Sequence, residues 1–419
     1  MTFTDLIQNA ALLRAINERG YSTPTPIQSS AIPLILQGSD VTASAQTGSG
    51  KTAAFCLPLL QQWSVERAIT PRRVRTLILV PTRELATQVG DVMRNLANHL
   101  PKPIKLSVVY GGISINPQML HLRGGADMVI ATPGRLLDLI RQHAVTISHV
   151  KTLVLDEADR LLESGFSDEI QQIFSLLPKE RQTVLISATF PDQVNELADV
   201  VLRAPVRIEV ADTPINKPSI HQRAIGVDMQ RRTELLIYLI RHHQWNRVLV
   251  FTSSRYASEL VAMKLRKAHI FAEPFHGELG QGKRTQVLSD FKTKRIQVIV
   301  ATDLASRGID IPNLPVVINY DPPRSSDDYT HRIGRTGRAG NAGSAINFVC
   351  ASNDAHFKFI EKSQQIHLER EHVPGFEPLL TDVSVTLEEK GPGGIKSHRP
   401  NKKDKLRMLT LAQTKNKST

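Results

Sequence analysis

The sequence predicts an α/β fold with two tandem domains, each a mostly parallel sheet covered by helices on both faces. Short apolar runs rich in β-branched residues recur along the chain, each followed by a small or polar turn and a helix-like stretch. Strands that are apolar throughout and alternate with helices are typical of a parallel sheet buried on both faces. The expected strands are Val41–Ala45, Thr76–Val80, Leu106–Tyr110, Met128–Ala131, Thr152–Leu155, Thr183–Ile186, Val248–Phe251, Val298–Ala301, Val316–Ile318 and Ala345–Val349.

A proline-containing break separates the two halves of this pattern. Residues 212–218 contain two prolines and no periodicity, which indicates an interdomain linker. Farther on, the segment 373–378 would end any helix, and the chain then becomes polar and basic, so we expect the last thirty residues to be largely disordered. The expected parts are a first domain, a linker, a second domain and a C-terminal extension with a basic tail, at residues 1–210, 211–219, 220–365 and 366–419.

The positive charge of the chain is concentrated at its end. The 419 residues have a net charge of +12, and residues 390–419 hold nine Lys or Arg against one acidic residue, Asp404. The rest of the chain is therefore only weakly basic, and any nucleic-acid binding there needs local sites. The tail is typical of a polycation that holds an anionic partner through phosphate contacts, although a solvated tail without a function is the alternative.

The composition also indicates the cellular compartment of the protein. No run of eighteen apolar residues is present, and Met1–Asp5 have neither the basic start nor the apolar stretch of a secretory signal. The two cysteines, Cys56 and Cys350, lie in apolar surroundings, so we expect them to be buried and reduced. These features favour a cytoplasmic protein without a membrane span.

A glycine-rich loop follows the first expected strand and precedes a helix-like stretch. Its glycines allow backbone N–H groups to surround phosphate oxygens, Lys51 brings a positive charge to the β- and γ-phosphates, and Thr52 offers a hydroxyl to Mg²⁺. Ala45 stands where the generic loop has its first glycine, and a turn without a ligand is the alternative. The predicted loop residues are Gln46, Thr47, Gly48, Ser49, Gly50, Lys51 and Thr52.

An acidic segment follows the strand Thr152–Leu155. Asp156 is placed to hold Mg²⁺ through water, because this cation prefers carboxylates and keeps much of its hydration. Glu157 is the natural group to orient and deprotonate an attacking water. Alone, these residues could simply begin a helix, but together with the glycine-rich loop they indicate nucleotide hydrolysis.

At this point a family resemblance becomes specific. Asp156-Glu157-Ala158-Asp159 resembles the motif that names the DEAD-box family, the ATP-dependent RNA helicases of superfamily 2. The segment Pro24–Gln28, with Phe3 and Tyr21, resembles the adenine-recognising segment of that family, and Ala45 matches the family's own variant of the loop. The resemblance implies two RecA-like domains, ATP and Mg²⁺ as cofactors and RNA as partner. It also implies that Gln28 pairs with the adenine edge and that Phe3 stacks on the ring.

Further motifs at strand ends resemble the RNA-contact motifs of the family. They begin at Pro81, Gly111 and Thr132 in the first half and at Phe251, Gln281 and Ala301 in the second. The resemblance implies RNA contacts by Arg83, Gly111, Gly112, Thr132, Pro133, Arg135, Thr252, Arg284, Thr302, Arg307 and Gly308, and a contact of Asp310 with the nucleotide. None of these expected RNA-contact residues is aromatic, so we expect backbone recognition with little sequence preference and discrimination against DNA through the 2′-hydroxyl.

The remaining motifs predict how hydrolysis is controlled. Arg335 and Arg338 are one helical turn apart and can point at one target, the γ-phosphate bound to the other domain. Only the first half has the glycine-rich loop, so hydrolysis requires the domains to close, and ATP and RNA binding become coupled. The resemblance implies that this coupling runs through Ser187, Thr189, Asp159 and His331.

Two other functions fit parts of this pattern. A DNA helicase on the same frame would share the loop and the arginines, and RNA-against-DNA competition separates it. An ATP-locked RNA clamp that serves as an assembly platform would show a long-lived RNA complex with a non-hydrolysable ATP analogue.

The segment Pro374–Pro378 and the short basic tail resemble the bacterial RhlE-like subgroup, which implies work in ribosome assembly or RNA decay. We expect a monomer.

Overall fold

The computed structural model of the chain describes most of the two expected domains. The described residues are 1–44, 49–66, 70–163, 165–209, 220–306, 314–337 and 343–378. The predicted linker and the predicted disordered tail lie outside the described residues, as do Gln46, Thr47, Gly48, Arg307, Gly308, Asp310 and Arg338.

The first half of the chain forms a seven-stranded parallel sheet in the order β3-β4-β2-β5-β6-β1-β7. Its strands are β1 (Val41–Ser44), β2 (Thr76–Leu79), β3 (Leu106–Val109), β4 (Met128–Ala131), β5 (Thr152–Asp156), β6 (Gln182–Ser187) and β7 (Val206–Glu209). All six expected strands are present. Sequence reasoning missed β7, because three of its four residues are exposed at the sheet edge and the strand is not apolar throughout.

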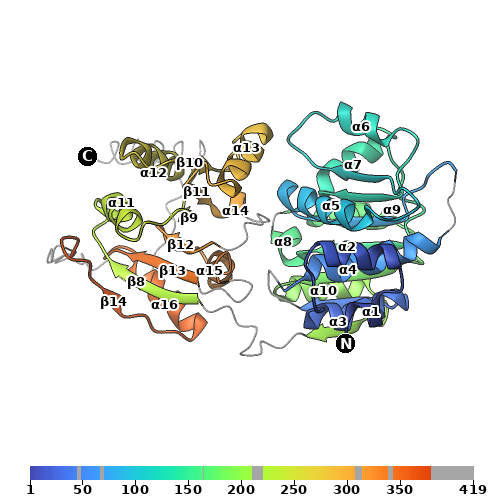
Figure 1. Cartoon of the computed structure of the whole chain (residues 1–419), viewed down its shortest axis with the longest axis horizontal. Helices are drawn as coiled ribbons and strands as arrows, with labels where there is room; N and C mark the ends of the chain where they lie inside the picture. The colour runs from blue at the N-terminus through green and yellow to red at the C-terminus, as the bar shows by residue number, and fades with distance from the viewer. Residues whose placement is uncertain are drawn as a thin grey trace, which may run out of the picture. The chain divides into compact units, whose positions relative to one another are not determined.

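Ten helices of the first half cover this sheet on both faces (Figure 1). They are α1 (Phe3–Leu6), α2 (Ala10–Glu18), α3 (Pro26–Leu36), α4 (Lys51–Val65), α5 (Arg83–Ala97), α6 (Asn116–Leu122), α7 (Pro133–Arg141), α8 (Ala158–Glu163), α9 (Ser167–Leu176) and α10 (Asp192–Val201). Successive strand residues point to opposite faces. Thus Ile78 joins the core beneath α1 to α5, whereas Leu77 and Leu79 join the core on the other face. The continuous apolar runs therefore do reflect burial on both faces.

The second half repeats this architecture with the strand order β10-β11-β9-β12-β13-β8-β14. Its strands are β8 (Ile220–Gly226), β9 (Val248–Thr252), β10 (Ala272–Phe275), β11 (Val298–Thr302), β12 (Val316–Asn319), β13 (Gly343–Val349) and β14 (Arg370–Glu371). Its helices are α11 (Arg232–His242), α12 (Arg255–Lys267), α13 (Gln281–Lys292), α14 (Asp303–Ser306), α15 (Ser326–Ile333) and α16 (Asp354–Gln364). All strand pairs are parallel, and apolar clusters on both faces bury them.

The prediction for the second sheet was incomplete at three strands. β8 begins with the polar sequence Ile220-His221-Gln222-Arg223, and β10 contains Pro274, so neither strand has the continuous apolar run used for recognition. β14 is two residues long and pairs with β8. It lies beyond residue 365, where the second domain was expected to end, and that boundary stays a prediction.

The parallel register brings the strand ends together. Leu79 is aligned with both Ala131 and Leu155, so the residues that follow β2, β4 and β5 emerge at one edge of the first sheet. Likewise, Thr252 is aligned with Thr302 in the second sheet. In open parallel sheets, ligands bind beyond this carboxyl edge. The predicted motifs at these strand ends therefore share one edge within each domain.

The expectation that the two cysteines are buried is met within the described part of the chain. Cys56 and Cys350 are both free and buried, and burial raises the pKa of the Cys56 thiol well above its usual range. Among the described residues, no helix combines the length and apolarity needed to cross a bilayer.

Candidate nucleotide and RNA site

The start of α4 is built against the start of α3. Gly50 precedes α4 in a left-handed conformation, with φ +92°, and accepts a hydrogen bond from Gln28 Nε2 at 3.1 Å through its carbonyl oxygen. A Cβ atom at Gly50 would lie 2.5 Å from Gln28 Nε2 and 2.9 Å from Thr25 Oγ1. Only glycine therefore allows both the backbone conformation and the close packing of these two segments.

The predicted adenine residues lie close to this junction. Gln28 is buried, and its Oε1 accepts a hydrogen bond from Thr25 N at 3.0 Å, so both ends of its amide are engaged within the protein. Phe3 is buried in the core beneath α1 to α5, and Tyr21 is half-buried with its hydroxyl 3.3 Å from Arg19 Nε. The adenine contacts of Phe3, Tyr21 and Gln28 stay predictions.

Lys51 provides the strongest indication of an anionic ligand. Its side chain is buried, yet Nζ has no hydrogen-bond partner among the described residues. A buried ammonium group without a partner is costly, so this arrangement indicates that an anion binds there. Thr52 follows at the start of α4 and Ser49 precedes it, in the arrangement that the loop motif predicted.

Asp156 lies at the carboxyl end of β5 and is buried. Burial raises the pKa of Asp156 to about 7, the Lys51 charge opposes this rise, and the neighbouring Glu157 charge adds to it. The Asp156 carboxyl group is thus close to Lys51, but the Lys51 charge only partly offsets the cost of burying a negative charge there. A divalent cation would supply the missing positive charge, so the donor set of Thr52 and Asp156 fits Mg²⁺.

Glu157 adopts an unusual backbone conformation. Its φ is +52°, although it is not a glycine, and such strain is concentrated at functional sites. The side chain is buried, and Oε2 lies 3.8 Å from Arg160 Nε, beyond hydrogen-bond distance. One carboxylate oxygen thus has no hydrogen-bond partner among the described residues, as a group that binds a water molecule requires.

The predicted coupling residues of the first domain are hydrogen-bonded to one another. Asp159 Oδ2 accepts from Thr189 N at 3.2 Å and from Thr189 Oγ1 at 3.0 Å. Ser187 Oγ accepts from Asp159 N at 3.2 Å and donates to the Thr189 carbonyl at 2.6 Å. The segment after β5 is therefore tied to the segment after β6, and a shift of one would move the other.

Three predicted RNA segments of the first domain meet at one place. Gly112 has φ +79°, and a Cβ atom there would overlap the Arg83 guanidinium at the start of α5. Arg135, in the first turn of α7, donates through Nη2 to the carbonyl of Ile113 at 2.7 Å. Arg135 is buried, so it holds the Gly111–Gly112 turn in position, and its Nε and Nη1 have no hydrogen-bond partners among the described residues. Thr132 and Pro133 begin α7 beside it.

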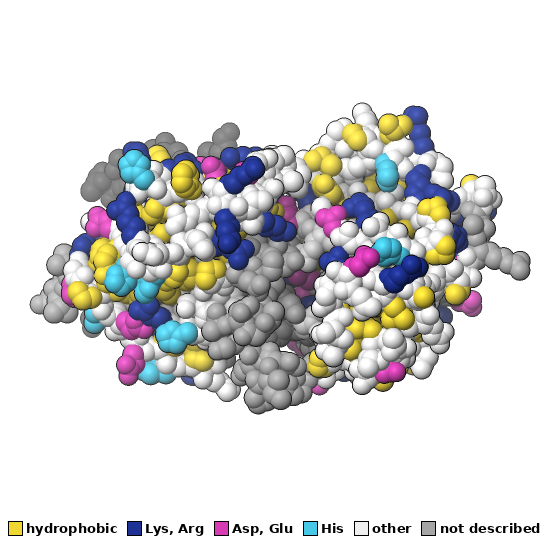
Figure 2. Space-filling view, in the orientation of Figure 1, with side chains coloured by type: hydrophobic (Ala, Val, Ile, Leu, Met, Phe, Trp, Pro, Cys, Tyr) yellow, Lys and Arg dark blue, Asp and Glu magenta, His cyan; other side chains and the backbone are white. Residues whose placement is uncertain are grey.

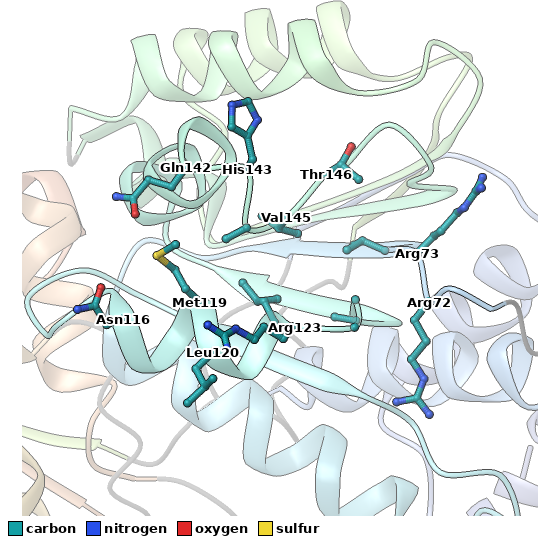
Figure 3. A pocket seen from close by; sticks show the side chains of 16 residues that line it. Arg72, Arg73, Asn116, Met119, Leu120, Arg123, Gln142, His143, Val145 and Thr146 are labelled. Atoms are coloured by element: carbon teal, nitrogen blue, oxygen red, sulfur yellow. The ribbon is translucent and has the colours of Figure 1, made fainter.

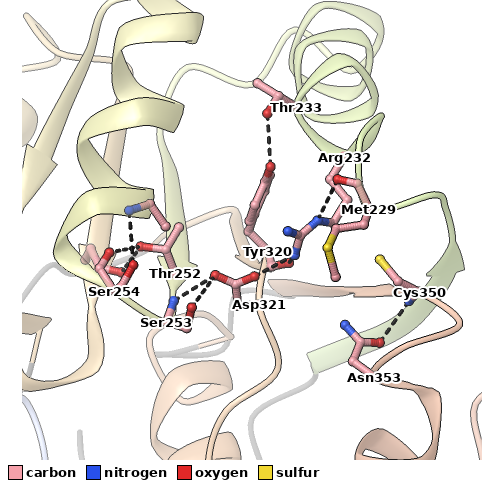
Figure 4. Close-up of polar contacts among 12 residues, drawn as sticks. Met229, Arg232, Thr233, Thr252, Ser253, Ser254, Tyr320, Asp321, Cys350 and Asn353 are labelled. Carbon is pink, nitrogen blue, oxygen red and sulfur yellow. Dashed lines mark hydrogen bonds and ion pairs between the residues drawn. The ribbon is translucent and has the colours of Figure 1, made fainter.

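In the second domain, a polar network holds the segment after β9 (Figure 4). Ser253 donates to Asp321 Oδ2 from its backbone N at 2.8 Å and from its hydroxyl at 2.9 Å. Arg232 donates to Asp321 Oδ1 at 2.5 Å, and its guanidinium lies 4.4 Å from the Tyr320 ring centroid. Sequence reasoning missed Arg232 and Asp321. Asp321 could have been found, because it follows β12 at the same carboxyl edge.

The other predicted RNA residues of the second domain differ in exposure. Thr252 is buried at the end of β9, while Thr302 is half-buried at the end of β11. Arg284 is buried, and its guanidinium donates to the carbonyls of His276 at 3.0 Å and Ala305 at 3.2 Å. Arg284 therefore holds its own domain together, and its RNA contact stays a prediction.

Arg332 is a functional candidate that the sequence analysis did not select. It is 2% exposed and donates to both carboxylate oxygens of Asp303, at 2.5 and 2.8 Å, and to Asn319 Oδ1 at 3.0 Å. Its guanidinium also lies 4.9 Å from the Phe251 ring centroid. Arg332 thereby joins α15 to the carboxyl ends of β9, β11 and β12. The local sequence does not distinguish Arg332 from the nearby arginines, because its partners come from the ends of three separate strands.

The helical spacing expected for Arg335 and Arg338 is wrong at its first member. α15 ends at Ile333 with Gly334 as its C-cap, and Thr336 forms a bridge with Leu314. Gly334 and Gly337 account for this end, since glycine is a poor helix former and Gly337 has φ +68°. His331 remains in the last turn of α15, and Arg335 is buried just beyond it.

Together, the two parallel sheets and the buried Lys51 that follows Gly50 at the start of α4 are typical of a P-loop nucleotide-binding protein with two RecA-like domains. The first domain matches the family model "DEAD/DEAH box helicase" over residues 25–197, and the second matches "Helicase conserved C-terminal domain" over residues 231–340. The chain belongs to the DEAD-box helicase family.

Similar proteins support this assignment. The chain is 39% identical to the DEAD-box ATP-dependent RNA helicase CshA of Streptococcus pneumoniae serotype 4, over 92% of this chain and 71% of that protein. It is also 39% identical to the DEAD-box ATP-dependent RNA helicase 28 of Arabidopsis thaliana, over 93% of this chain and 49% of that protein.

Two solved structures show the same fold. The S. cerevisiae protein Dbp5, bound to RNA and ADP BeF3, is 29% identical with a TM-score of 0.78, covering 88% of this chain and 95% of that chain. Mss116p, bound to ssRNA and AMP-PNP, is 28% identical with a TM-score of 0.80, covering 89% and 79%.

Proposed function

We propose that the protein is an ATP-dependent RNA helicase that uses RNA-stimulated ATP hydrolysis to separate short RNA duplexes or remodel RNA–protein complexes. The carrying observation is the buried Lys51 ammonium without a hydrogen-bond partner among the described residues, close to the carboxyl group of Asp156, which Glu157 follows in the chain. This arrangement suits a phosphate chain followed by a water molecule. The names of the relatives, and the RNA and nucleotide analogues in the solved neighbours, support the same activity.

The first domain holds the nucleotide in this proposal. Lys51 contacts the β- and γ-phosphates, and the positive end of α4 favours their negative charge. Phe3, Tyr21 and Gln28 contact adenine, and Asp310 of the second domain faces the nucleotide. The backbone of the loop surrounds the phosphates through Gln46, Thr47, Gly48, Ser49 and Gly50.

Mg²⁺ is the proposed metal, held by Thr52 and, largely through water, by Asp156. Bound there, Mg²⁺ neutralises charge that develops on the phosphate oxygens. Glu157 orients the attacking water and accepts its proton. Arg335 and Arg338 stabilise the transition state, a role that is typically worth about 10³–10⁵ in rate.

RNA binding controls hydrolysis because the catalytic groups belong to different domains. Lys51 and Glu157 belong to the first, and Arg335 and Arg338 belong to the second. RNA that contacts both domains favours closure and thereby raises the affinity for ATP, and the coupling is reciprocal. Ser187, Thr189, Asp159 and His331 transmit this coupling. The proposed RNA contacts are Arg83, Gly111, Gly112, Thr132, Pro133, Arg135, Thr252, Arg284, Thr302, Arg307 and Gly308.

Energetics favour local strand separation. Each base-pair step contributes about 1.4 kcal/mol in DNA, so separating ten steps at once would need roughly 14 kcal/mol. Breaking a few pairs costs far less, and the remainder of a short duplex dissociates unaided. We therefore expect unwinding to decline steeply with duplex length.

The decisive experiment is steady-state ATP hydrolysis with and without single-stranded RNA. Single-stranded DNA and the Glu157→Gln protein serve as controls. We expect strong stimulation by RNA alone, abolished in Glu157→Gln. Equal stimulation by DNA would support the DNA-helicase alternative, and no RNA effect would contradict the proposed coupling.

The cellular context is a further part of the proposal. The Pro374–Pro378 segment and the basic tail resemble the RhlE-like subgroup, which supports work on structured RNA in ribosome assembly or RNA decay. We further propose a cytoplasmic protein, from its composition, that acts as a monomer. Light scattering during size exclusion measures the oligomeric state, and co-sedimentation with ribosomal precursors tests the pathway. A dimer, or the absence of ribosomal RNA from the captured RNA, would count against the respective part.

A further inference from the structure

A pocket of about 590 Å³ lies at the amino edge of the second sheet. β10, β11 and β9 are parallel neighbours, so the loops that precede them emerge side by side. These loops contribute Trp245, Phe271 and Arg295 to the pocket. The predicted RNA motifs follow the same strands and emerge at the opposite, carboxyl edge. The pocket is therefore separate from the RNA track proposed above.

Aromatic side chains form one part of this pocket. Phe271 lines the pocket and is 73% exposed, so its ring is accessible to a ligand. Trp245 is half-buried and stacks on His243, with 4.7 Å between the ring centroids and 15° between the planes. A separate stacked pair lies on α11, where the ring centroids of His242 and Tyr238 are 5.4 Å apart, and His242 meets His243 edge-on at 84°. Within the pocket itself, Trp245 and Phe271 supply the large aromatic surface.

Positive side chains form the other part. Arg241, Lys294 and Arg295 line the pocket and are exposed, and none of the described residues that line it is acidic. Arg295 Nη1 lies 3.7 Å from Asp290 Oδ1, outside the lining, so Arg241 and Lys294 carry most of the available positive charge. Arg241 Nη2 donates to the Ala268 carbonyl at 2.7 Å, which fixes its guanidinium at the rim. Figure 2 shows hydrophobic, histidine and Lys or Arg side chains next to one another over α11 and α12.

The backbone at the pocket is also unusual. Gln244, His269 and Lys294 follow α11, α12 and α13, and all three have a positive φ, between +51° and +62°. Glycine is the residue that favours this conformation at a helix end. Polar or positive side chains occur instead at all three positions, and all three line the same pocket.

The first domain contains a second pocket, which is also positively charged but has no aromatic stacking surface among its described lining residues. This pocket, of about 650 Å³, lies at the amino ends of β2 and β4, with Arg72, Arg73 and Arg123 around it (Figure 3). Met119 and Val145 form part of its apolar surface, and no Phe, Tyr or Trp occurs among the described residues that line it. It has a similar positive charge without a stacking surface, so it provides a matched control.

We propose that the pocket of the second domain, lined by Trp245, Phe271 and Arg241 with Lys294 and Arg295, is a second binding site for single-stranded RNA. A base stacks on Phe271 against Trp245, and the positive side chains contact the flanking phosphates. Aromatic faces with interleaved cations are the chemistry that recognises single strands without sequence preference. The site would hold a single-stranded segment that extends beyond the RNA track to the opposite edge of the second sheet. The inference rests on RNA being the substrate.

The test is fluorescence anisotropy of the full chain with a labelled single-stranded U12 RNA at about 150 mM salt, without nucleotide. We expect Phe271→Ala to weaken binding by about tenfold, as the loss of one stacked base predicts. Phe359→Ala is the matched control, since Phe359 is 66% exposed on α16 and lies outside the pocket. The double variant Lys294→Gln/Arg295→Gln should weaken binding more than Arg73→Gln/Arg123→Gln, which removes the same charge from the first domain.

Two readouts separate this inference from the proposed function. At saturating RNA, Phe271→Ala should keep the RNA-stimulated ATPase rate, because the catalytic track is intact. Normal U12 binding by Phe271→Ala, with RNA-stimulated ATPase preserved, would overturn the second site and leave the helicase. Binding of a labelled polyglutamate peptide that Phe271→Ala abolishes, while U12 binding is unchanged, would instead identify a protein-docking site. Loss of RNA stimulation in the wild-type protein would overturn the proposed function itself.

Discussion

The Thr189 hydroxyl donates a 3.0 Å hydrogen bond to Asp159, and the Thr189 backbone N–H donates a second bond to the same carboxylate oxygen. Asp159 belongs to the acidic segment after β5, whereas Thr189 follows β6. These two hydrogen bonds therefore tie the segment after β5, which carries the proposed catalytic carboxylates, to the segment after β6. We propose that this link carries the coupling between hydrolysis and strand separation.

The first prediction removes this hydroxyl. Thr189→Val keeps the shape of the side chain but deletes one hydrogen bond to a carboxylate, an interaction worth about 1.5–3 kcal/mol. We expect RNA-stimulated ATPase within a few fold of wild type and a duplex-unwinding rate at least tenfold lower, measured on a short RNA duplex. Thr183→Val is the control, because Thr183 is buried on β6 and its hydroxyl has no hydrogen-bond partner among the described residues. Equal losses of ATPase and unwinding would argue against a coupling role.

The second prediction concerns pH. Burial raises the pKa of Asp156 to about 7, so below pH 7 the ligand-free carboxyl carries a proton that Mg²⁺ must displace. The affinity for Mg²⁺ and ATP should fall by up to about tenfold per pH unit below 7 and stay level above it. Isothermal titration with a non-hydrolysable analogue measures this, and Asp156→Asn should remove the pH dependence.

The same shift has a consequence for stability with the opposite sign. In the unfolded chain Asp156 ionises near its ordinary pKa of 3.8, so between about pH 4 and 7 only the folded protein binds this proton. The contribution of Asp156 to the free energy of unfolding therefore falls as pH rises through this window. Urea unfolding of the ligand-free protein should show a larger decline for wild type than for Asp156→Asn, and parallel curves would contradict the raised pKa.

The third prediction uses two glycines with the same backbone geometry. Gly50 and Gly38 have φ +92° and +83°, but a Cβ atom at Gly50 would meet Gln28, whereas at Gly38 it would meet nothing within 4 Å. Gly50→Ala should lower ATP affinity by at least tenfold, because Gln28 and the loop before α4 must move apart. Gly38→Ala should cost only the backbone strain of about 1–3 kcal/mol, with normal ATP affinity. Fluorescent-nucleotide binding and thermal unfolding distinguish the two effects, and equal ATP affinities would refute the packing argument.

The sequence predicts those features of the molecule that depend on local composition and spacing, and it does not predict those set by tertiary packing. Continuous apolar runs predicted six of the seven strands described in the first sheet, since burial on both faces requires apolar residues on both sides of a strand. Edge strands such as β7 and the polar start of β8 leave no such mark. Lys51 begins α4 and Asp156 ends β5, and a parallel sheet brings the segments after its strands to one edge. The roles of these two residues at a nucleotide stay predictions. The partners of Arg332 are set by tertiary packing between four elements, and no local spacing in the sequence encodes them.

The last prediction therefore tests Arg332, which the structure adds to the site. Its guanidinium is 2% exposed and pairs with both oxygens of Asp303, so Arg332→Ala leaves a carboxylate and several carbonyl or amide oxygens without their donor. Removing one partner of a buried ion pair typically costs about 3–5 kcal/mol. Chemical unfolding should show that loss in the second domain's transition. Arg332→Lys should recover little of it, because an ammonium group cannot make the bidentate contact. A wild-type unfolding profile for Arg332→Ala would show that the pair contributes little.

Arg335 should behave differently from Arg332. Arg335→Ala should lower the ATPase rate by about 10³ while the protein remains folded, as expected for a group that acts on the transition state. Full ATPase activity for Arg335→Ala would remove Arg335 from the proposed catalytic groups.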